Sequence, residues 1–121
     1  MTPVASSEVL DRCIRECLEC LQLTSRCVDA CLRSDQAKAM ERCIRLCLDC
    51  TDLCATCVEM LGRNSDFARQ VCETLAAVCD ACATECDRHA GMDDLMRRCA
   101  EACRRCADVC RQVGRQLAAA A

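Results

Sequence analysis

The chain has 121 residues, 18 of them cysteine, with 16 Lys and Arg against 19 Asp and Glu for a net charge of −3. This length allows one domain, expected over residues 1–121. Apart from Cys and Ala, its apolar side chains are 12 Leu, 8 Val, 5 Met, 2 Ile and 1 Phe, too few for a conventional core unless cysteine fills interior positions.

The cysteines fall into four groups along the chain, and within each group the steps are 3, 4 or 7 residues. At ~100° per residue these steps keep every group on one narrow stripe of an α-helix, whereas a strand would need steps of two. The groups predict four helices with one sulfur face each: Cys13, Cys17, Cys20, Cys27 and Cys31; Cys43, Cys47, Cys50, Cys54 and Cys57; Cys72, Cys79, Cys82 and Cys86; Cys99, Cys103, Cys106 and Cys110.

Short polar or glycine-containing segments separate the groups. Ser34-Asp35 offers a helix N-cap, Gly62 offers a helix C-terminus before a second cap, and Gly91 precedes Asp93. Because short connections place successive helices antiparallel, we predict an all-α fold, an up-down-up-down four-helix bundle with a cysteine-lined core. The expected helices span residues 7–33, 35–61, 65–89 and 93–117.

Composition also limits partners and location. The chain has one aromatic residue, so it lacks the aromatic side chains on which nucleic-acid bases stack. Acidic residues stand beside its arginine pairs, so it also lacks a basic stripe that would bind phosphates. The sequence has no apolar run long enough to span a membrane. The N-terminus shows no export signal, so we expect a reducing cytoplasm, in which the thiols stay reduced.

The cysteines need an explanation beyond packing. A cysteine on the inward stripe of a helix buries less apolar surface than Leu or Ile would. Burial of such a large side chain stabilises the fold by ~1.5–3 kcal/mol. Disulfides between positions three or four apart would close loops that a helix already fixes. Cys-x-x-Cys matches such as Cys54 and Cys57 resemble redox motifs but lack the strand–turn–helix context.

Metal ligation accounts for the pattern directly. Residues three and four apart on a helix lie ~5–6 Å apart at Cβ, so neighbouring thiolates can share an ion. Zinc and iron–sulfur centres want four ligands, usually from loops, and we expect straight helical stripes to supply tetrahedral sets poorly. Soft thiolates in this geometry favour Cu(I).

Charge gives the expected capacity. Buried thiolates would carry 18 negative charges and could not stay ionised in a low-dielectric core without compensation. One monovalent cation per sulfur cancels that charge, which predicts about 18 Cu(I) per chain, roughly one per cysteine.

The two ends of the predicted bundle differ. One end collects Cys31, Cys86, His89 and three methionines, which makes it the expected copper entrance, with His89 as a ligand and Met40, Met92 and Met96 as candidate entry residues. A lone His at a helix C-terminus is otherwise a cap that interacts with the helix dipole. The opposite end is expected to be an apolar plug of Val9, Leu10, Met60, Leu61, Phe67, Val113 and Leu117.

Four helices with Cys-x3-Cys-x2-Cys repeats, such as Cys13-Cys17-Cys20 and Cys99-Cys103-Cys106, resemble the cytosolic copper storage proteins over almost the whole chain. The resemblance implies a bundle filled with Cu(I)–thiolate sites, an entry end with His and Met, and a homotetramer. It implies that all 18 cysteines are ligands, while the non-cysteine positions Leu75 and Ala76 interrupt the third stripe.

We therefore predict non-catalytic cytosolic storage or buffering of Cu(I). The alternatives are a copper metallochaperone or sensor, which needs one exposed thiol pair, and a zinc–thiolate store. An enzyme is not expected, because the sequence contains no paired base and nucleophile and its single histidine lies at a helix end. The sequence names no delivery partner.

Overall fold

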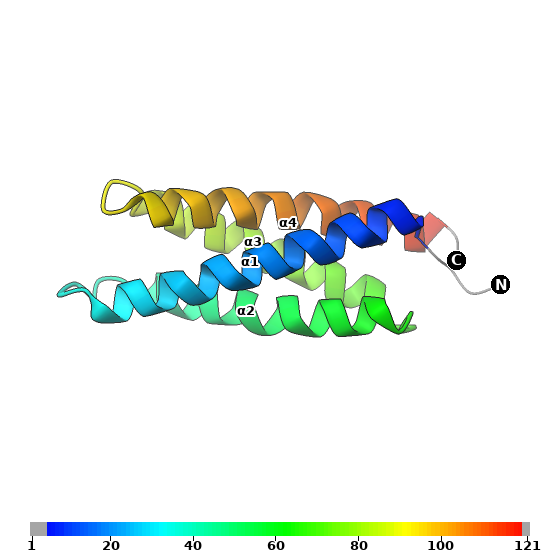
Figure 1. The fold of residues 1–121 in the computed structure, drawn as a ribbon, viewed down its shortest axis with the longest axis horizontal. Helices are drawn as coiled ribbons and strands as arrows, with labels where there is room; N and C mark the ends of the chain where they lie inside the picture. Colours follow the sequence, from blue (N-terminus) through cyan, green and yellow to red (C-terminus); the bar gives the residue numbers. More distant parts are fainter. Residues whose placement is uncertain (1–4, 120–121) are drawn as a thin grey trace.

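The computed structural model describes residues 5–119, which form four long helices. They are α1 (Ser7–Arg33), α2 (Glu41–Gly62), α3 (Ala68–Arg88) and α4 (Asp94–Ala119). Figure 1 shows the helices running side by side, with the start of α1, the α2–α3 connection and the end of α4 at one end of the bundle. We call this the terminal end, and the opposite end, which carries the α1–α2 and α3–α4 connections, the loop end.

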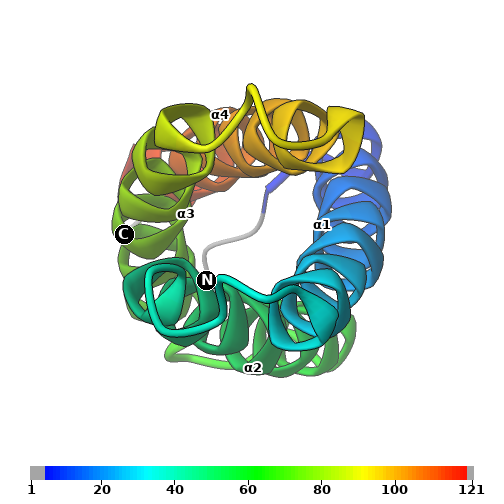
Figure 2. The ribbon, with the colours of Figure 1, turned by 90° about the vertical axis from the view of Figure 1, so that its left-hand side faces the viewer.

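The helices form a closed ring in the order α1, α2, α3, α4, and α4 packs back onto α1 (Figure 2). Each helix packs only against its two neighbours in the ring, within the described residues. The predicted antiparallel up-down-up-down bundle is confirmed. A single stripe on each helix therefore faces the axis, and the side chains on those stripes fill the centre.

The first helix has the predicted bounds, but the second begins at Glu41, six residues later than expected. Ser34 leaves the helix with extended backbone (φ −73°, ψ 157°), and its hydroxyl accepts a hydrogen bond from the backbone N–H of Gln36. The segment from 35 to 40 then forms hydrogen-bonded turns that end with the side chain of Met40 fully buried. Ser34 closes α1 and does not cap α2.

The α2–α3 connection depends on Asn64 and not on Gly62. Asn64 has φ 52°, whereas Gly62 remains the last residue of α2. The N–H of Ser65 bonds the carbonyl of Met60 (3.0 Å) and that of Asn64 bonds Leu61 (3.2 Å), the pair of bonds that defines a Schellman ending. This ending delays the start of α3 to Ala68.

The fourth helix is capped near the predicted position. The carboxylate of Asp93 accepts a hydrogen bond from the N–H of Leu95 (3.0 Å), and α4 begins at Asp94 and continues to Ala119, two residues beyond the expected end. The third helix ends at Arg88, one residue early.

Few large apolar side chains support this core. Leu75, Val109 and Val113 are fully buried and Leu23 is nearly so, while most remaining interior volume belongs to cysteine. The helices pack closely where α4 presents the buried alanines Ala100, Ala102 and Ala107. The metal-free bundle thus depends on a small number of aliphatic contacts.

Charged side chains cover the outer surface. Arg105 of α4 pairs with Glu16 (3.2 Å) and Glu19 (3.1 Å) of α1, and Arg104 pairs with Asp87 of α3. Arg104 and Arg105 therefore lie on a solvated face of α4. Within residues 5–119, we find no helix apolar enough over a sufficient length to cross a membrane.

Truncating Leu75 tests the dependence on aliphatic contacts. Leu75 is 0% exposed, so Leu75→Ala should destabilise the reduced, metal-free protein by about 2–5 kcal/mol, the usual cost of such a cavity. The control variant Phe67→Ala, at a side chain that is 64% exposed, should change stability by about 0.5 kcal/mol or less. Anaerobic urea unfolding measures both; equal losses would contradict the prediction.

Candidate metal centre

All 18 cysteines are free thiols on the inner stripes of the four helices, and none is more than 2% exposed. The 3-and-4 spacing explains this directly, because it returns each cysteine to the same side of its helix. The burial predicted for every member of the four groups is confirmed.

The sulfurs meet across the helix interfaces. Between α1 and α4, Sγ–Sγ distances are 3.9, 3.7 and 3.8 Å for Cys13–Cys110, Cys17–Cys106 and Cys20–Cys103. Between α2 and α3, they are 3.8, 3.6 and 3.6 Å for Cys43–Cys86, Cys47–Cys82 and Cys57–Cys72. The bundle thus aligns its sulfurs in successive layers along the axis.

Several layers gather four thiols. Within each set every sulfur lies within 4.8 Å of the others: Cys13, Cys57, Cys72 and Cys110; Cys27, Cys43, Cys47 and Cys86; Cys47, Cys82, Cys86 and Cys99. Four thiols meet in each of these sets, although straight helical stripes are expected to supply tetrahedral sets poorly. Each stripe alone offers a line of sulfurs, but the four stripes of a closed ring face one another.

Four buried side chains other than cysteine interrupt the layers. Thr24 (0% exposed) occupies the α1 stripe between Cys20 and Cys27, and its hydroxyl lies 2.9 Å from that of Thr51 on α2. Leu75 and Ala76 are buried on α3, as predicted. At the loop end the thioether sulfur of Met96 lies 3.6 Å from Cys27 Sγ.

Hydrogen bonds among the thiols lower the pKa of some cysteines and raise the pKa of others. The bond with Cys110 lowers the pKa of Cys13 to about 5, and the bond with Cys103 lowers that of Cys79 to about 3, because a thiolate that accepts S–H bonds is stabilised. The pKa values of Cys103 and Cys110 are raised by bonds to neighbouring thiols and by burial. A cation entering this core therefore displaces protons.

The predicted entrance residues are only partly brought together. Met40 and Met96 are buried, whereas Met92 is 46% exposed on the outside of the loop end. The His89 side chain is 18% exposed and follows the last residue of α3. His89 is therefore partly buried at the loop end, and its role as an entrance ligand stays a prediction.

Glu85 is a residue of this end that the sequence analysis missed. Its side chain is 6% exposed, and its carboxylate hydrogen-bonds His89 Nε2 (3.1 Å) and Arg88 (2.9 Å) and forms an ion pair with Arg42 of α2 (3.6 Å). A carboxylate on one ring nitrogen fixes the orientation of an imidazole and frees the other nitrogen to act as a ligand. The sequence did contain a sign of this contact, because Glu85 and His89 are four residues apart and such residues are neighbours on a helix.

The apolar plug at the terminal end is smaller than predicted. Val113 and Leu61 are buried, and Val9, Leu10 and Leu117 pack against the core. Phe67 is 64% exposed and does not belong to the plug, because it precedes α3 in the connection and faces solvent.

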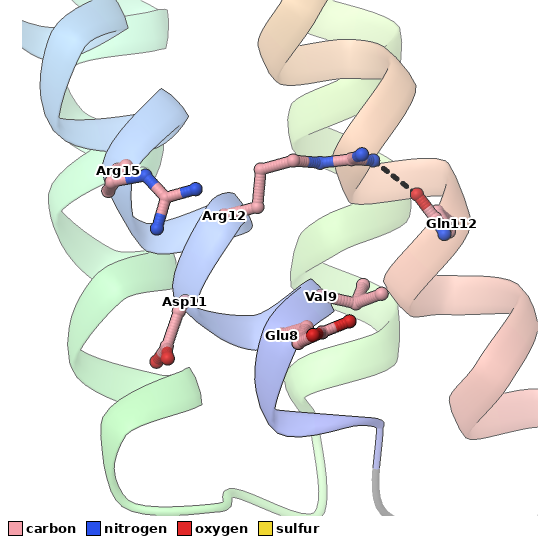
Figure 3. A pocket seen from close by; sticks show the side chains of 6 residues that line it. All are labelled: Glu8, Val9, Asp11, Arg12, Arg15 and Gln112. Carbon is pink, nitrogen blue, oxygen red and sulfur yellow. Dashed lines mark hydrogen bonds between the residues drawn. The ribbon is translucent and has the colours of Figure 1, made fainter.

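A surface hollow near the start of α1 lies outside the sulfur core. Figure 3 shows Arg12 reaching from α1 to donate a hydrogen bond to the side chain of Gln112 on α4. The lining consists of Glu8, Val9, Asp11, Arg12, Arg15 and Gln112. Because it contains no sulfur and its charged side chains are exposed, this hollow is a solvated groove and not part of the metal centre.

The fold and the buried sulfur layers define a thiol-lined four-helix bundle, a class of metal-binding protein. The family model described as copper storage protein matches residues 6–115. The chain therefore belongs to the copper storage protein family, and its function is copper storage. No curated protein matches it.

Solved structures agree with this assignment. A copper storage protein of Streptomyces lividans loaded with 10 copper equivalents is 41% identical, with TM-score 0.87 over 91% of this chain and 86% of its own. A cytosolic copper storage protein of the same organism with five coppers is 41% identical (TM-score 0.85; 89% and 93%). Cu(I)-bound Csp3 of Bacillus subtilis is 34% identical (TM-score 0.82; 88% and 98%).

The thiol of Cys31 gives a pH test of the metal-free core. Burial is the largest cause that raises its pKa from 9.0 to about 11. The unfolded chain loses this proton at lower pH than the folded one, so the stability contributed by Cys31 is complete below pH 9.0 and declines as the pH rises to about 11. Anaerobic urea unfolding at several pH values measures it.

The control is Cys31→Ser, which has no thiol to titrate at this position. The difference in unfolding free energy between the wild type and this variant should shrink from pH 9.0 to about 11. A difference that stays constant across this window contradicts the prediction.

Proposed function

We propose that the chain stores Cu(I) on all 18 of its cysteines, at roughly one ion per sulfur. The observation that carries the proposal is the continuous axial arrangement of buried sulfurs, with contacts of 3.6–4.0 Å. Soft thiolates select Cu(I), and thiolates in such contact can bridge successive ions. Cu(I) in the related Csp3 supports the oxidation state.

Charge supports the stoichiometry. A fully deprotonated core would bury 18 negative charges with no basic side chain on the inner stripes, which low dielectric forbids unless cations enter. One Cu(I) for each thiolate restores neutrality. Thr24, Leu75 and Met96 interrupt the layers, so the capacity should follow the cysteine count and not the number of stripe positions.

The burial of the cysteines favours storage over transfer of single ions. A metallochaperone or sensor needs an exposed thiol pair that a partner can reach, and the most exposed cysteine here, Cys31, is only 2% exposed. A zinc–thiolate store is less suited, because two of the three four-thiol sets share Cys47 and Cys86. We propose a non-catalytic role for the whole chain, residues 1–121, as one domain.

Copper is proposed to enter and leave at the loop end. His89 is partly buried at the loop end and is oriented by Glu85, while the Met96 sulfur contacts Cys27 of the sulfur core. Imidazole nitrogen and thioether sulfur are suitable transient ligands for Cu(I), and Met40 and Met92 flank the same end. The terminal end offers aliphatic side chains instead.

The setting is proposed by similarity and surface chemistry. The cytosolic relative in Streptomyces lividans supports a cytoplasmic location. Exposed leucines on α1 and α2, namely Leu18, Leu32 and Leu48 at 46–60% exposure, are suitable contacts for assembly as a homotetramer.

Anaerobic titration of the reduced apoprotein with Cu(I) against a competing chelator tests capacity. We expect saturation at about 18 ions per chain, because each thiolate charge requires one monovalent cation. Thr24→Cys should raise the capacity by about one ion by adding a sulfur to an interrupted layer, and Cys103→Ser should lower it. Saturation of the wild type at one or two ions would overturn the storage proposal.

Stopped-flow uptake tests the entrance. His89→Ala and Met96→Leu should each slow Cu(I) uptake several-fold while leaving most of the capacity intact, since they remove ligands on the path inward. Met60→Leu, a half-buried methionine near the terminal end, is the matched control and should load at the wild-type rate. Equal rates in all four proteins would exclude entry at His89.

A further inference from the structure

Among the three four-thiol sets named above, the one at the terminal end differs in the helices that supply it. It takes Cys13 from α1, Cys57 from α2, Cys72 from α3 and Cys110 from α4, so each helix contributes one sulfur. All four side chains are at most 1% exposed. We call this set the terminal thiol layer.

Its four sulfurs are arranged in three dimensions and not in a plane. Cys13–Cys110 and Cys57–Cys72 are 3.9 and 3.6 Å apart, and every remaining pair lies within 4.8 Å. A flat rectangle with these two edges would need its other edges to be ~3 Å, shorter than ordinary non-bonded contact at ~3.5–4.0 Å. The four sulfurs therefore depart from a plane, as tetrahedral coordination of one ion requires.

Zinc bound by four thiolates is tetrahedral. Zn–S bonds of ~2.3 Å place the sulfurs of a regular tetrahedron ~3.8 Å apart, close to the two distances observed here. The ideal lies within the spread of the terminal thiol layer, so modest side-chain adjustment suffices.

The other four-thiol sets are less suitable. The first takes Cys43 and Cys47 from α2, and the second takes Cys82 and Cys86 from α3, so each connects only three helices. Because both sets contain Cys47 and Cys86, they cannot both be occupied as separate tetrahedral sites. The terminal thiol layer shares no cysteine with either.

We propose that the terminal thiol layer binds one tetrahedral divalent ion of the zinc class in the copper-free protein. Binding replaces the protons of whichever of the four thiols are protonated and forms four metal–sulfur bonds, with no change of oxidation state. The ion joins all four helices where α1 begins and α4 ends. This site rests on local geometry and does not depend on the Cu(I) capacity of the chain.

The test uses the full-length reduced protein under anaerobic conditions with Co(II) as the spectroscopic probe. A tetrahedral tetrathiolate site gives intense sulfur-to-cobalt charge-transfer bands and visible ligand-field bands. Cys57→Ser removes the terminal thiol layer, and Cys47→Ser removes both other sets. The two cysteines lie on the same helix and are equally buried, so they form a matched pair.

The first equivalent of Co(II) should give tetrathiolate bands in the wild type and in Cys47→Ser, and should lose them in Cys57→Ser. Zn(II) should displace the cobalt and raise the thermal midpoint of the first two proteins only, because it binds the folded state. Bands retained at full intensity in Cys57→Ser, lost in Cys47→Ser or missing from the wild type would overturn the proposal.

Helical circular dichroism of each metal-free variant establishes that it is folded. Should Cys57→Ser not fold, Cys72→Ser on α3 removes the same layer, and Cys82→Ser on the same helix is its control. Cu(I) titration of the same preparations measures storage separately, so failure of the zinc site and failure of storage give different results.

Discussion

The confinement of many thiols in one low-dielectric space is the constraint on which the rest of this structure depends. Eighteen buried sulfurs can remain thiols or become thiolates, but they cannot all ionise unless cations accompany them. In the metal-free state, hydrogen bonds among the thiols lower the pKa of Cys13 and raise that of Cys110. Copper loading exchanges those protons for metal, which links storage to folding and to pH.

A core made mostly of cysteine contains few large aliphatic side chains that stabilise it by packing. Leu75, Val109 and Val113 supply the little aliphatic burial available, and the alanines of α4 allow close helix contact. Inter-helix ion pairs such as Arg105–Glu16 lie at the surface, where each contributes little stability. A metal that binds the thiols of the folded bundle adds stability to a core with few aliphatic contacts.

The sequence predicted the fold and the sulfur faces well, because a spacing of three and four residues admits one interpretation on a helix. It predicted the connections less well. Asn64, and not Gly62, adopts the left-handed backbone conformation after α2. The turn over residues 35–40, which buries Met40, makes α2 begin later than predicted. Phe67 was expected in the apolar plug from its position along the chain, but the turn before α3 directs it to solvent.

The sequence by itself determined that the chain is four helices, that every cysteine faces inward, and that the two ends differ in ligand chemistry. The first two follow from periodicity within one helix, and the third from the short connections that make successive helices antiparallel. Only the tertiary structure decided which sulfurs meet, because that depends on the register of each helix against its neighbours. The layer of Cys13, Cys57, Cys72 and Cys110, the contact between Met96 and Cys27, and the burial of Glu85 beside His89 all arise from that register.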